Sequence, residues 1–478
     1  MWGNRRVWMV LGAAIVVLAG ACSGGDPPEE AGQPADGSGV AQAGKIGLAV
    51  STPQVVQAES GLFPTTATDA RSGAVYVAYA RELPGPEGHD EDPLVEAVVA
   101  RSDDGGKTFG APVVVSPPGM AVHTRSVSPT EVEVGPEGEV YVLFKHVEGL
   151  ENYGSARRQM HLVRSDDGGK TFSAPVDVAS EAVEGVVSSM DMLDLFIAPD
   201  GDVFVSFLDS REKIAKALAS AGAKEPDHSG HGATEEREIN TMRVSRSADG
   251  GRTFAKSTLV AQDVCVCCGT KVAQGGAGDA PVFVTTRSEW MEFKDSKDAV
   301  RDPFLSVSGD EGQTWSKATK IHDDRFKVSS CPDVNAGLEV DSKGRLHAAW
   351  YTGTDRGPGV YYARSEDDGK NFSEPVALLT DDWIPYGDVV MAIDRDDVAW
   401  VAYEDRRSDV DQIQVVRVGP DGELTYSESW PGNTPDLGVG DDGIRVVWSG
   451  AADEEEEAAG PIKFAAVTLG GDEAAAGH

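Results

Sequence analysis

A nine-residue string, RSDDGGKTF, occurs at residues 101–109 and again, letter for letter, at 164–172. Looser copies of the string lie at residues 246–254, 307–315 and 364–372. The copies share the pattern Ser-x-Asp-x-Gly-x-Thr-aromatic, with one Asn in place of Thr, and their central acidic residues are Asp104, Asp167, Asp249, Asp310 and Asp367. Repeats 57 to 82 residues apart that are flanked by strand-like segments indicate a propeller or a solenoid.

The repeated string has the composition of a tight turn between two strands. Glycine adopts the positive φ angles that such turns require. An Asp carboxylate accepts hydrogen bonds from turn amides and from a neighbouring Thr hydroxyl. The aromatic residue is expected to pack between adjacent sheets. We therefore expect the five central Asp residues to be structural rather than catalytic.

Alternating apolar and polar segments accompany the repeats and read as strands. The longer ones span residues 72–82, 137–146, 200–212, 280–290, 343–352, 396–407 and 442–450. A decayed sixth repeat lies at 417–426, and the last unit ends in a strand at 461–469. The segment 51–57 has the composition of the outer strand that this last unit lacks. The sequence thus predicts an all-β fold, a β-propeller of four-stranded antiparallel blades. We count seven blades, closed by the N-terminal strand.

The repeat resembles the Asp-box, or BNR repeat, of the sialidase (neuraminidase) superfamily, and the resemblance covers nearly all of residues 45–469. It implies a propeller of six blades, as the alternative to seven, and an exo-alpha-sialidase-type glycoside hydrolase. In that family the boxes lie on the face opposite the active site. Three Arg residues hold the substrate carboxylate, an Asp is the acid/base, and a Tyr is the nucleophile.

On this resemblance Tyr386 is the candidate nucleophile and Asp191 the candidate acid/base. Arg125 with Arg211 or Arg406 is the candidate clamp, and Arg287 is a further candidate for substrate binding. The family's first Arg belongs to an Arg-Ile-Pro motif, where this chain reads Gly-Leu-Phe-Pro at 61–64. The resemblance therefore leaves hydrolysis and glycan binding without hydrolysis as alternatives.

The arginines can also be interpreted without the family resemblance. In a propeller, the loops after the second strands and the connections between blades share one face, around the mouth of the central pocket. Guanidinium groups at this mouth suit a glycan or another small carboxylate ligand. The alternative is that they pair with adjacent acids, as in Asp209–Arg211 or Glu404–Arg406.

Four cysteines fall in connections on the same face: Cys265, Cys267, Cys268 and Cys331. An even number in an exported protein predicts two disulfides, one of them joining Cys331 to Cys267 or Cys268. The alternative is a metal-binding protein, because thiolates bind copper and other soft ions. His123, Met190 and Met192 lie on the same predicted rim and could add ligands. No other cofactor is predicted.

One long loop follows the third alternating segment, over residues 209–240. Its first part, residues 211–225, has the apolar spacing of a helix that could cover the pocket. A His-rich stretch at 227–232 resembles copper-binding tails, with a solvated loop as the alternative.

The N-terminus has the features of a targeting segment. Arg5 and Arg6 precede an apolar run at 7–21, which is short for a membrane span and typical of a signal peptide. Residues 18–22 resemble a lipobox, with Cys22 as the lipidated residue. Ordinary signal-peptide cleavage is the alternative. We expect a lipoprotein signal peptide over residues 1–22, a disordered tether over 23–44, and a disordered tail over 470–478.

These features predict an exported bacterial lipoprotein, monomeric and attached through its lipid to the outer membrane or cell surface. The net charge of −37 disfavours nucleic acid as a partner, because phosphate backbones need basic surfaces. A propeller that binds a protein partner without any chemistry is the remaining alternative.

Overall fold

The computed structural model describes residues 45–58, 61–83, 95–148, 157–183, 185–186, 190–221, 240–262, 264–265, 267–288, 299–328, 332–354, 357–451 and 460–470. The predicted signal peptide, the tether, most of the tail, the His-rich stretch, Cys22 and Cys331 lie outside these ranges. Within them, no helix is long and apolar enough to cross a lipid bilayer.

The described chain is almost entirely β, as the sequence predicts, and each of the seven long alternating segments contains a strand. Consecutive strands pair in antiparallel groups. The groups from the first half of the chain are β4 Gly61–Thr68, β5 Val75–Glu82, β6 Val95–Ser102 and β7 Val113–Val114; β9 Glu131–Val134, β10 Val140–Glu148, β11 Arg157–Ser165 and β12 Val176–Asp177; and β13 Met190–Ile197, β14 Val203–Asp209, β15 Thr241–Ser247 and β16 Thr258–Gln262.

The groups from the second half follow the same order of strands. They are β17 Lys271–Gln274, β18 Val282–Arg287, β20 Pro303–Ser308 and β21 Thr319–Lys320; β23 Ala336–Val340, β24 Leu346–Thr352, β25 Gly359–Ser365 and β26 Val376–Thr380; β27 Val389–Ile393, β28 Ala399–Asp405, β29 Gln412–Val418 and β30 Leu424–Tyr426; and β31 Trp430–Val439, β32 Ile444–Gly450 and β33 Ile462–Leu469. Short strands add to them: β8 Val122–His123 pairs with β6 and β10, and β19 Ala299–Val300 pairs with β22 Lys327–Val328.

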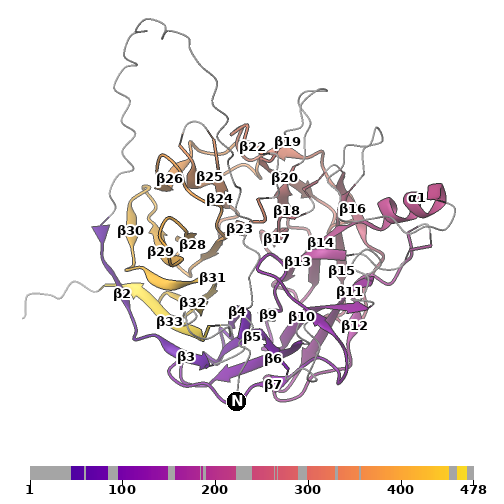
Figure 1. Ribbon diagram of the computed structural model, residues 1–478, viewed down its shortest axis with the longest axis horizontal. Helices are drawn as coiled ribbons and strands as arrows, with labels where there is room; N and C mark the ends of the chain where they lie inside the picture. The colour runs from indigo at the N-terminus through magenta and orange to yellow at the C-terminus, as the bar shows by residue number, and fades with distance from the viewer. Residues whose placement is uncertain are drawn as a thin grey trace, which may run out of the picture. The chain divides into compact units, whose positions relative to one another are not determined.

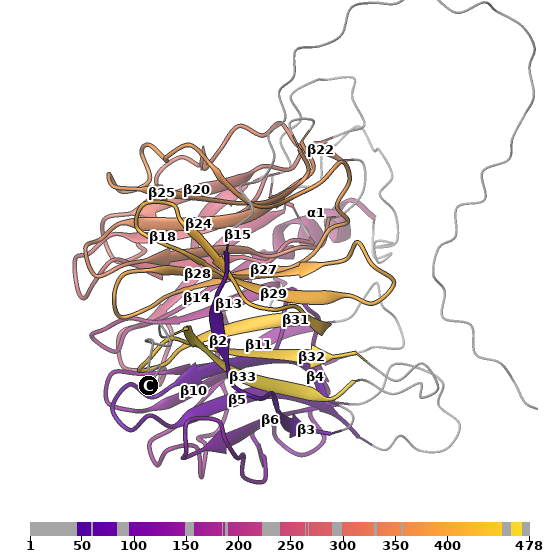
Figure 2. The same ribbon diagram turned by 90° about the vertical axis from the view of Figure 1, so that its left-hand side faces the viewer.

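Among the strands labelled in Figure 1, the first strands β4, β9, β13, β17, β23 and β31 lie near the middle of the described fold, and the last strands β7, β12, β16, β26 and β30 lie at its edge. The strands run along the direction of view of Figure 1, as the turned view shows (Figure 2). Each first strand contacts the first strand of the next group, in the order β4, β9, β13, β17, β23, β27, β31 and back to β4. Residues from all seven groups therefore meet around one central line.

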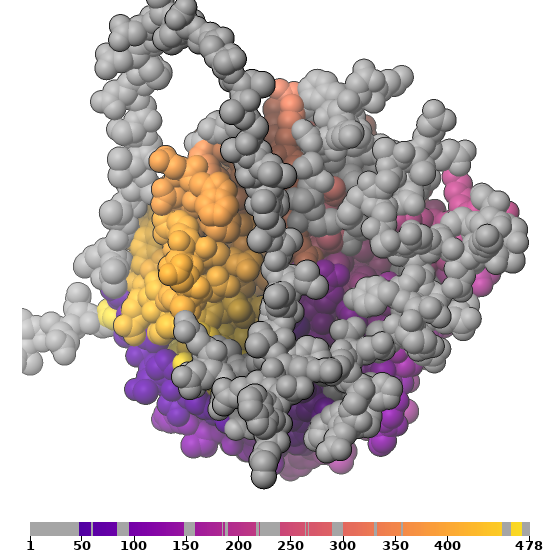
Figure 3. All heavy atoms as spheres, viewed as in Figure 1, coloured from indigo at the N-terminus to yellow at the C-terminus, as the bar shows by residue number. Residues whose placement is uncertain are grey.

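The two ends of the described chain pair with each other. β3 Gln54–Gln57 and β2 Leu48–Val50 both pair antiparallel with β33, and β1 Lys45–Ile46 pairs parallel with β30. In the space-filling view, indigo atoms of the first strands lie against yellow atoms of the last (Figure 3). The outer strand expected from residues 51–57 is present at the expected partner.

The repeated turns have the hydrogen bonds expected from their sequence. In the first copy, Asp104 accepts from the Thr108 amide at 2.9 Å, the Thr108 hydroxyl at 2.7 Å and the Ser102 hydroxyl at 2.7 Å. The corresponding bonds form in the other four copies, with Asn371 replacing Thr in the last. The Thr108 hydroxyl and amide, followed by Ser102, lower the pKa of Asp104 to about 2. These carboxylates form their hydrogen bonds within their own turns, as expected of structural residues.

The aromatic residue of each turn packs against the preceding group of strands. Phe109 meets Phe464 of β33 with ring centroids 5.2 Å apart, while Phe172, Phe254, Trp315 and Phe372 pack into the cores behind them. Gly106 has φ 89°, and a Cβ there would lie 1.9 Å from the Phe464 ring. The repeat thus joins neighbouring groups as well as neighbouring strands.

One helix, α1 Arg211–Ala221, occurs in the described chain where the sequence predicts helical spacing. It lies at the outer edge beside the third group of strands, away from the central strands (Figure 1). The expectation that this helix covers the pocket is therefore not met by its described residues. Its first residue explains the position, because Arg211 is fully buried against Asp209 at the end of β14.

Candidate functional site at the centre of the strands

Three cavities lie among the central strands. One, which we call the mouth cavity, has a volume of about 200 Å³ and is lined by Phe63, Ser126, Asp333, Tyr386, Gly387, Asp388, Glu404, Arg406, Asp411, Asn433 and Thr434. A smaller central cavity shares Phe63, Ser126, Asp388 and Thr434 with it. A third cavity at the far ends of the first strands includes Asp341 and Asp394. The mouth cavity lies where the sequence places the connections between blades.

Segments distant in sequence meet at this mouth. Arg125 forms an ion pair with Asp333, with Nη2–Oδ2 at 3.0 Å. Asn335 donates from its side chain to the Ser126 carbonyl at 3.4 Å. Gly269 permits this approach, because a Cβ at that position would lie 1.8 Å from the Asn335 side-chain oxygen. The connection before the second group therefore contacts the one before the fifth.

The first strands begin with irregular backbone. Their register shifts between Leu62 and Thr65, between Asp191 and Asp194, and between Asn433 and Asp436. Four non-glycine residues near these starts have positive φ angles: Phe63 at 49°, Met192 at 53°, Asp333 at 51° and Thr434 at 49°. Such conformations cost free energy and tend to cluster at functional sites.

Buried carboxylates satisfy amides that the neighbouring first strands leave free. Glu131 accepts from the Leu195 amide at 2.6 Å, Asp194 from the Val272 amide at 2.8 Å, and Asp436 from the Thr66 amide at 2.8 Å. Each bond joins two adjacent groups of strands. Lys271 forms an ion pair with Asp194 at 2.5 Å. The acidic centre of the fold is therefore structural in large part.

Asp388 and Glu404 form a different carboxyl pair, on the wall of the mouth cavity. Asp388 is 5 % exposed and accepts from the Asn335 amide at 3.0 Å. Glu404 accepts from the Thr434 amide at 2.6 Å and from the Asp388 amide at 3.3 Å. Burial, and then the charge of Glu404, raise the pKa of Asp388 to about 8. Asp388 is therefore a carboxylic acid, able to donate a proton, at neutral pH.

Tyr386 lines the same cavity, and its place depends on the glycine after it. A Cβ on Gly387 would lie 2.7 Å from the Glu404 carbonyl, so only glycine allows this segment to lie against β28. The Tyr386 ring contacts Tyr351, with ring centroids 5.5 Å apart. Among the described residues, no carboxylate accepts a hydrogen bond from the Tyr386 hydroxyl. Tyr386 therefore lies in the wall of the mouth cavity, and no described carboxylate is placed to activate its hydroxyl as a nucleophile.

Asp191 does not have the environment of an acid/base. It forms ion pairs with Lys145 and, at 3.7 Å, with Arg158. Burial alone would raise the pKa of Asp191, but the charge and hydrogen bond of Lys145, with Arg158, hold it well below the ordinary value. Asp191 thus remains an anion and does not line the mouth cavity.

The candidate arginines divide into two pairs. Arg211 and Arg287 are buried and correct the expectation that they face a ligand: Arg211 pairs with Asp209 at 2.8 Å, and Arg287 donates to the carbonyls of Arg301 and Tyr351. Arg125 and Arg406 are partly exposed, at 38 % and 47 % of their side chains. Arg406 contacts Asp411, with Nε–Oδ2 at 3.4 Å, so both exposed arginines have carboxylate partners.

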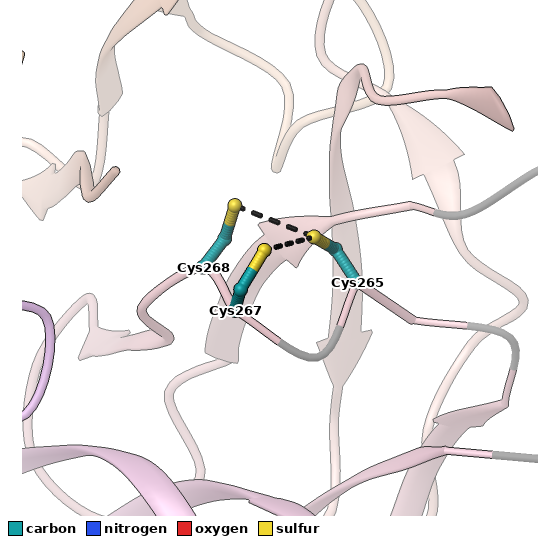
Figure 4. A group of neighbouring side chains, drawn as sticks. All are labelled: Cys265, Cys267 and Cys268. Carbon is teal, nitrogen blue, oxygen red and sulfur yellow. Dashed lines mark hydrogen bonds between the residues drawn. The ribbon is translucent and has the colours of Figure 1, made fainter. Parts of the chain in front are cut away.

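Three of the predicted cysteines come together. The Sγ atom of Cys265 lies 3.3 Å from that of Cys267 and 3.4 Å from that of Cys268 (Figure 4). No disulfide is formed among these three cysteines, and the expected partner Cys331 lies outside the described residues. Met190 and Met192 pack into two apolar cores that do not include the cysteines. Val334 and Tyr386 pack against the cysteines.

No family model matches the chain, and no curated protein matches it. Solved structures with a similar fold include a Hadza microbial sialidase, at 15 % identity and a TM-score of 0.48 over 79 % of this chain and 68 % of that one. An ulvan lyase has 12 % identity and a TM-score of 0.47 over 88 % and 94 % of the chains. The intramolecular trans-sialidase of Ruminococcus gnavus has 14 % identity and a TM-score of 0.40 over 86 % and 94 %. At these sequence identities and TM-scores, the similarities do not indicate the activity of this chain.

The sequence indicated the connection over residues 382–389 but not its most distinctive group. Asp388 lies two residues after Tyr386 in this connection, and its closeness to a candidate site residue could have pointed to it. Glu404 and Asp333 had no such signal, because their neighbours come from other groups of strands.

Proposed function

We propose that this chain is a glycan-binding propeller protein and that the mouth cavity holds the sugar. The observation that carries the proposal is the mouth cavity itself, where the neutral acid Asp388 lies beside the rings of Phe63 and Tyr386 and the polar groups of Asn433 and Arg406. Aromatic walls with a few convergent polar groups are typical of small-molecule sites.

The fold that we infer around this site is a closed propeller of seven blades. The order of contacts among the first strands, which returns from β31 to β4, supports seven rather than six. The pairing of β3 with β33 supports closure by the N-terminal strand. As part of the same proposal, the protein is exported and attached to the outer membrane or cell surface through Cys22.

The size of the cavity limits the ligand. A volume of about 200 Å³ is below the roughly 300–1,000 Å³ of sites for drug-sized ligands. We infer that one sugar ring enters it, as the terminal unit of a longer glycan. Trp383, with 70 % of its surface exposed, lies in the same connection as Tyr386 and offers a flat surface to the next unit.

The charges favour a neutral sugar over a sialic acid. A carboxylate ligand would have to displace Asp333 from Arg125 or Asp411 from Arg406. The expected Arg of the first blade is replaced by the segment at 61–64. A neutral sugar makes no such demand, and its hydroxyls match the oxygens and amides of the wall.

Asp388 has a role that an ionised carboxylate lacks. As an acid it donates a hydrogen bond to a sugar oxygen. If that oxygen is the glycosidic one, the same group supplies the proton for cleavage, which is general acid catalysis. We assign Tyr386 to the wall of the cavity and not to a nucleophile.

The test is a glycan array and a panel of chromogenic glycosides with neutral terminal sugars, probed with the full-length chain and two variants. Asp388→Ala is expected to weaken binding about 10-fold or more, since it removes the O–H donor at the sugar oxygen. Glu339→Ala is the matched control, because its carboxyl also has a pKa raised to about 8 by burial but does not line the mouth cavity. No binding to any neutral glycan, or equal loss in both variants, would contradict the proposal.

A further inference from the structure

The three buried cysteines have no part in sugar binding, and their arrangement suggests a role of its own. We call Cys265, Cys267 and Cys268 the thiol cluster. All three sulfur atoms lie within 4.8 Å of one another and point into one space (Figure 4). Separations of 3.3 and 3.4 Å exceed the S–S bond of about 2.05 Å. Three thiolates that bind one ion at about 2.3 Å each lie roughly 4 Å apart, so small movements of the side chains would bring the three sulfur atoms to that spacing.

The local backbone holds these thiols in place. The Cys265 amide donates to the Arg287 carbonyl at 2.9 Å, which attaches the segment to the end of β18. Gly269 follows directly and packs its α-carbon against Asn335, leaving no room for a side chain. Both contacts are independent of any bound ion, so the thiol cluster is preorganised.

The charges around the thiol cluster call for an anion. Arg287 is 1 % exposed, and its hydrogen-bond acceptors are two carbonyls. Within the described residues, no carboxylate forms an ion pair with it. A buried, uncompensated cation is strongly unfavourable. Arg287 is adjacent to the thiol cluster, since its carbonyl accepts a hydrogen bond from the Cys265 amide at 2.9 Å, so thiolates bound to a metal ion there would supply a nearby negative charge.

We propose that the thiol cluster is a binding site for one copper(I) ion. Three thiolates and Cu(I) carry a net charge of −2, part of which the guanidinium group of Arg287 offsets. Soft thiolate ligands select Cu(I), and the group that the described residues bring together consists of three sulfurs without histidine or carboxylate.

The surroundings suit a buried soft ion. Cys265 and Cys268 are 0 % exposed and Cys267 is 7 % exposed, and Val334 and Tyr386 pack against them. Tyr386 separates the thiol cluster from the mouth cavity, since it belongs to the linings of both. The copper site does not depend on the sugar site, and each can fail without the other.

The test is an anaerobic titration of the full-length, reduced chain with Cu(I) against a chromophoric Cu(I) chelator. We expect one Cu(I) per chain, and X-ray absorption of the loaded protein is expected to show three sulfur neighbours. Single substitutions Cys265→Ser, Cys267→Ser and Cys268→Ser should each weaken binding by more than about 100-fold, beyond the 10–100-fold typical of outer groups. Met190→Leu is the control, since it changes a buried sulfur residue outside the thiol cluster and should leave affinity unchanged.

A second variant tests the charge argument without touching a ligand. Arg287→Met should lower Cu(I) affinity about 10–100-fold while leaving three sulfur neighbours in the absorption spectrum. Circular dichroism verifies that each variant is folded. If the Cys variants do not fold, the number of sulfur neighbours in the unmodified protein decides alone. No tight Cu(I) binding, fewer than three sulfur neighbours, or preferential retention of zinc would overturn the proposal.

Discussion

Arg125 and Asp333 are 208 residues apart in the chain, yet they form an ion pair beside the mouth cavity, which Asp333 lines. The pair joins the connection before the second group of strands to the connection before the fifth. Both side chains are partly exposed, at 38 % and 43 %. It is therefore a contact that can open without disturbing the core.

Removal of this pair should affect access more than stability. We expect Arg125→Ala to lower the free energy of unfolding by less than about 1 kcal/mol, because exposed ion pairs contribute about 0–1 kcal/mol. The opened mouth should bind larger terminal sugars than the unmodified protein does. Urea denaturation and the glycan array measure the two effects. A loss above 2 kcal/mol would show that the pair is a structural brace.

The packing between the first and last groups of strands can be tested by substitution of two adjacent glycines. Gly105 and Gly106 have φ angles of 73° and 89°, so alanine is strained at both. Nothing lies within 4 Å of a Cβ at Gly105, whereas one at Gly106 would clash with Phe464 of β33. Gly105→Ala should cost about 1 kcal/mol and Gly106→Ala about 2–4 kcal/mol. Equal costs in thermal unfolding would argue against the packing of the first turn on β33.

Stability should be greatest at mildly acidic pH. Burial raises the pKa of Asp388 and Glu339 to about 8 and that of Asp436 to about 6. The folded state then binds these protons more tightly than the unfolded chain, whose carboxyl pKa values are about 4. The stability they contribute is therefore lost as pH rises from about 4 to about 8.

The turn carboxylates have the opposite dependence. The pKa of Asp104 and that of Asp249 are lowered to about 2, so their contribution is lost as pH falls from about 4 to 2. Together the two sets predict a maximum of the melting temperature at about pH 4. A melting temperature that increases steadily from pH 5 to pH 8 would contradict the raised pKa values of the central carboxyls.

The exposed Trp383 gives a prediction about chain length. Trp383→Ala should weaken binding of oligosaccharides by about 5–10-fold, in line with the roughly 1–1.5 kcal/mol of an exposed aromatic contact, and leave monosaccharide affinity unchanged. The free energy of unfolding should not change, because the Trp383 side chain is 70 % exposed. Isothermal titration with a monosaccharide and a trisaccharide compares the two. Equal loss for both would place Trp383 inside the mouth cavity.

The sequence was most informative where structure is local. The hydrogen bonds of Asp104 involve residues within four positions, so the string itself predicts them. Period-2 patterns placed the strands for the same reason. The outer strand at 51–57 pairs with a segment far away in the sequence. It was still predictable, because the last repeat unit lacked an outer strand of its own.

The site was less predictable, because its chemistry depends on contacts between distant segments. Arg211 looked like a ligand-binding residue in the sequence, but the buried Asp209 two positions earlier holds it in the core. Asp191 looked like an acid, yet Lys145 keeps it ionised. The raised pKa of Asp388 comes from burial beside Glu404, which no spacing in the sequence reveals.

The most direct test of the account is a crystal structure of the full-length chain with the tightest-binding neutral monosaccharide from the array. We predict one sugar ring in the mouth cavity, between Phe63 and Tyr386, with an oxygen within hydrogen-bond distance of the Asp388 carboxyl. A sugar bound in the cavity at the far ends of the first strands, or on an outer surface, would contradict the central claim.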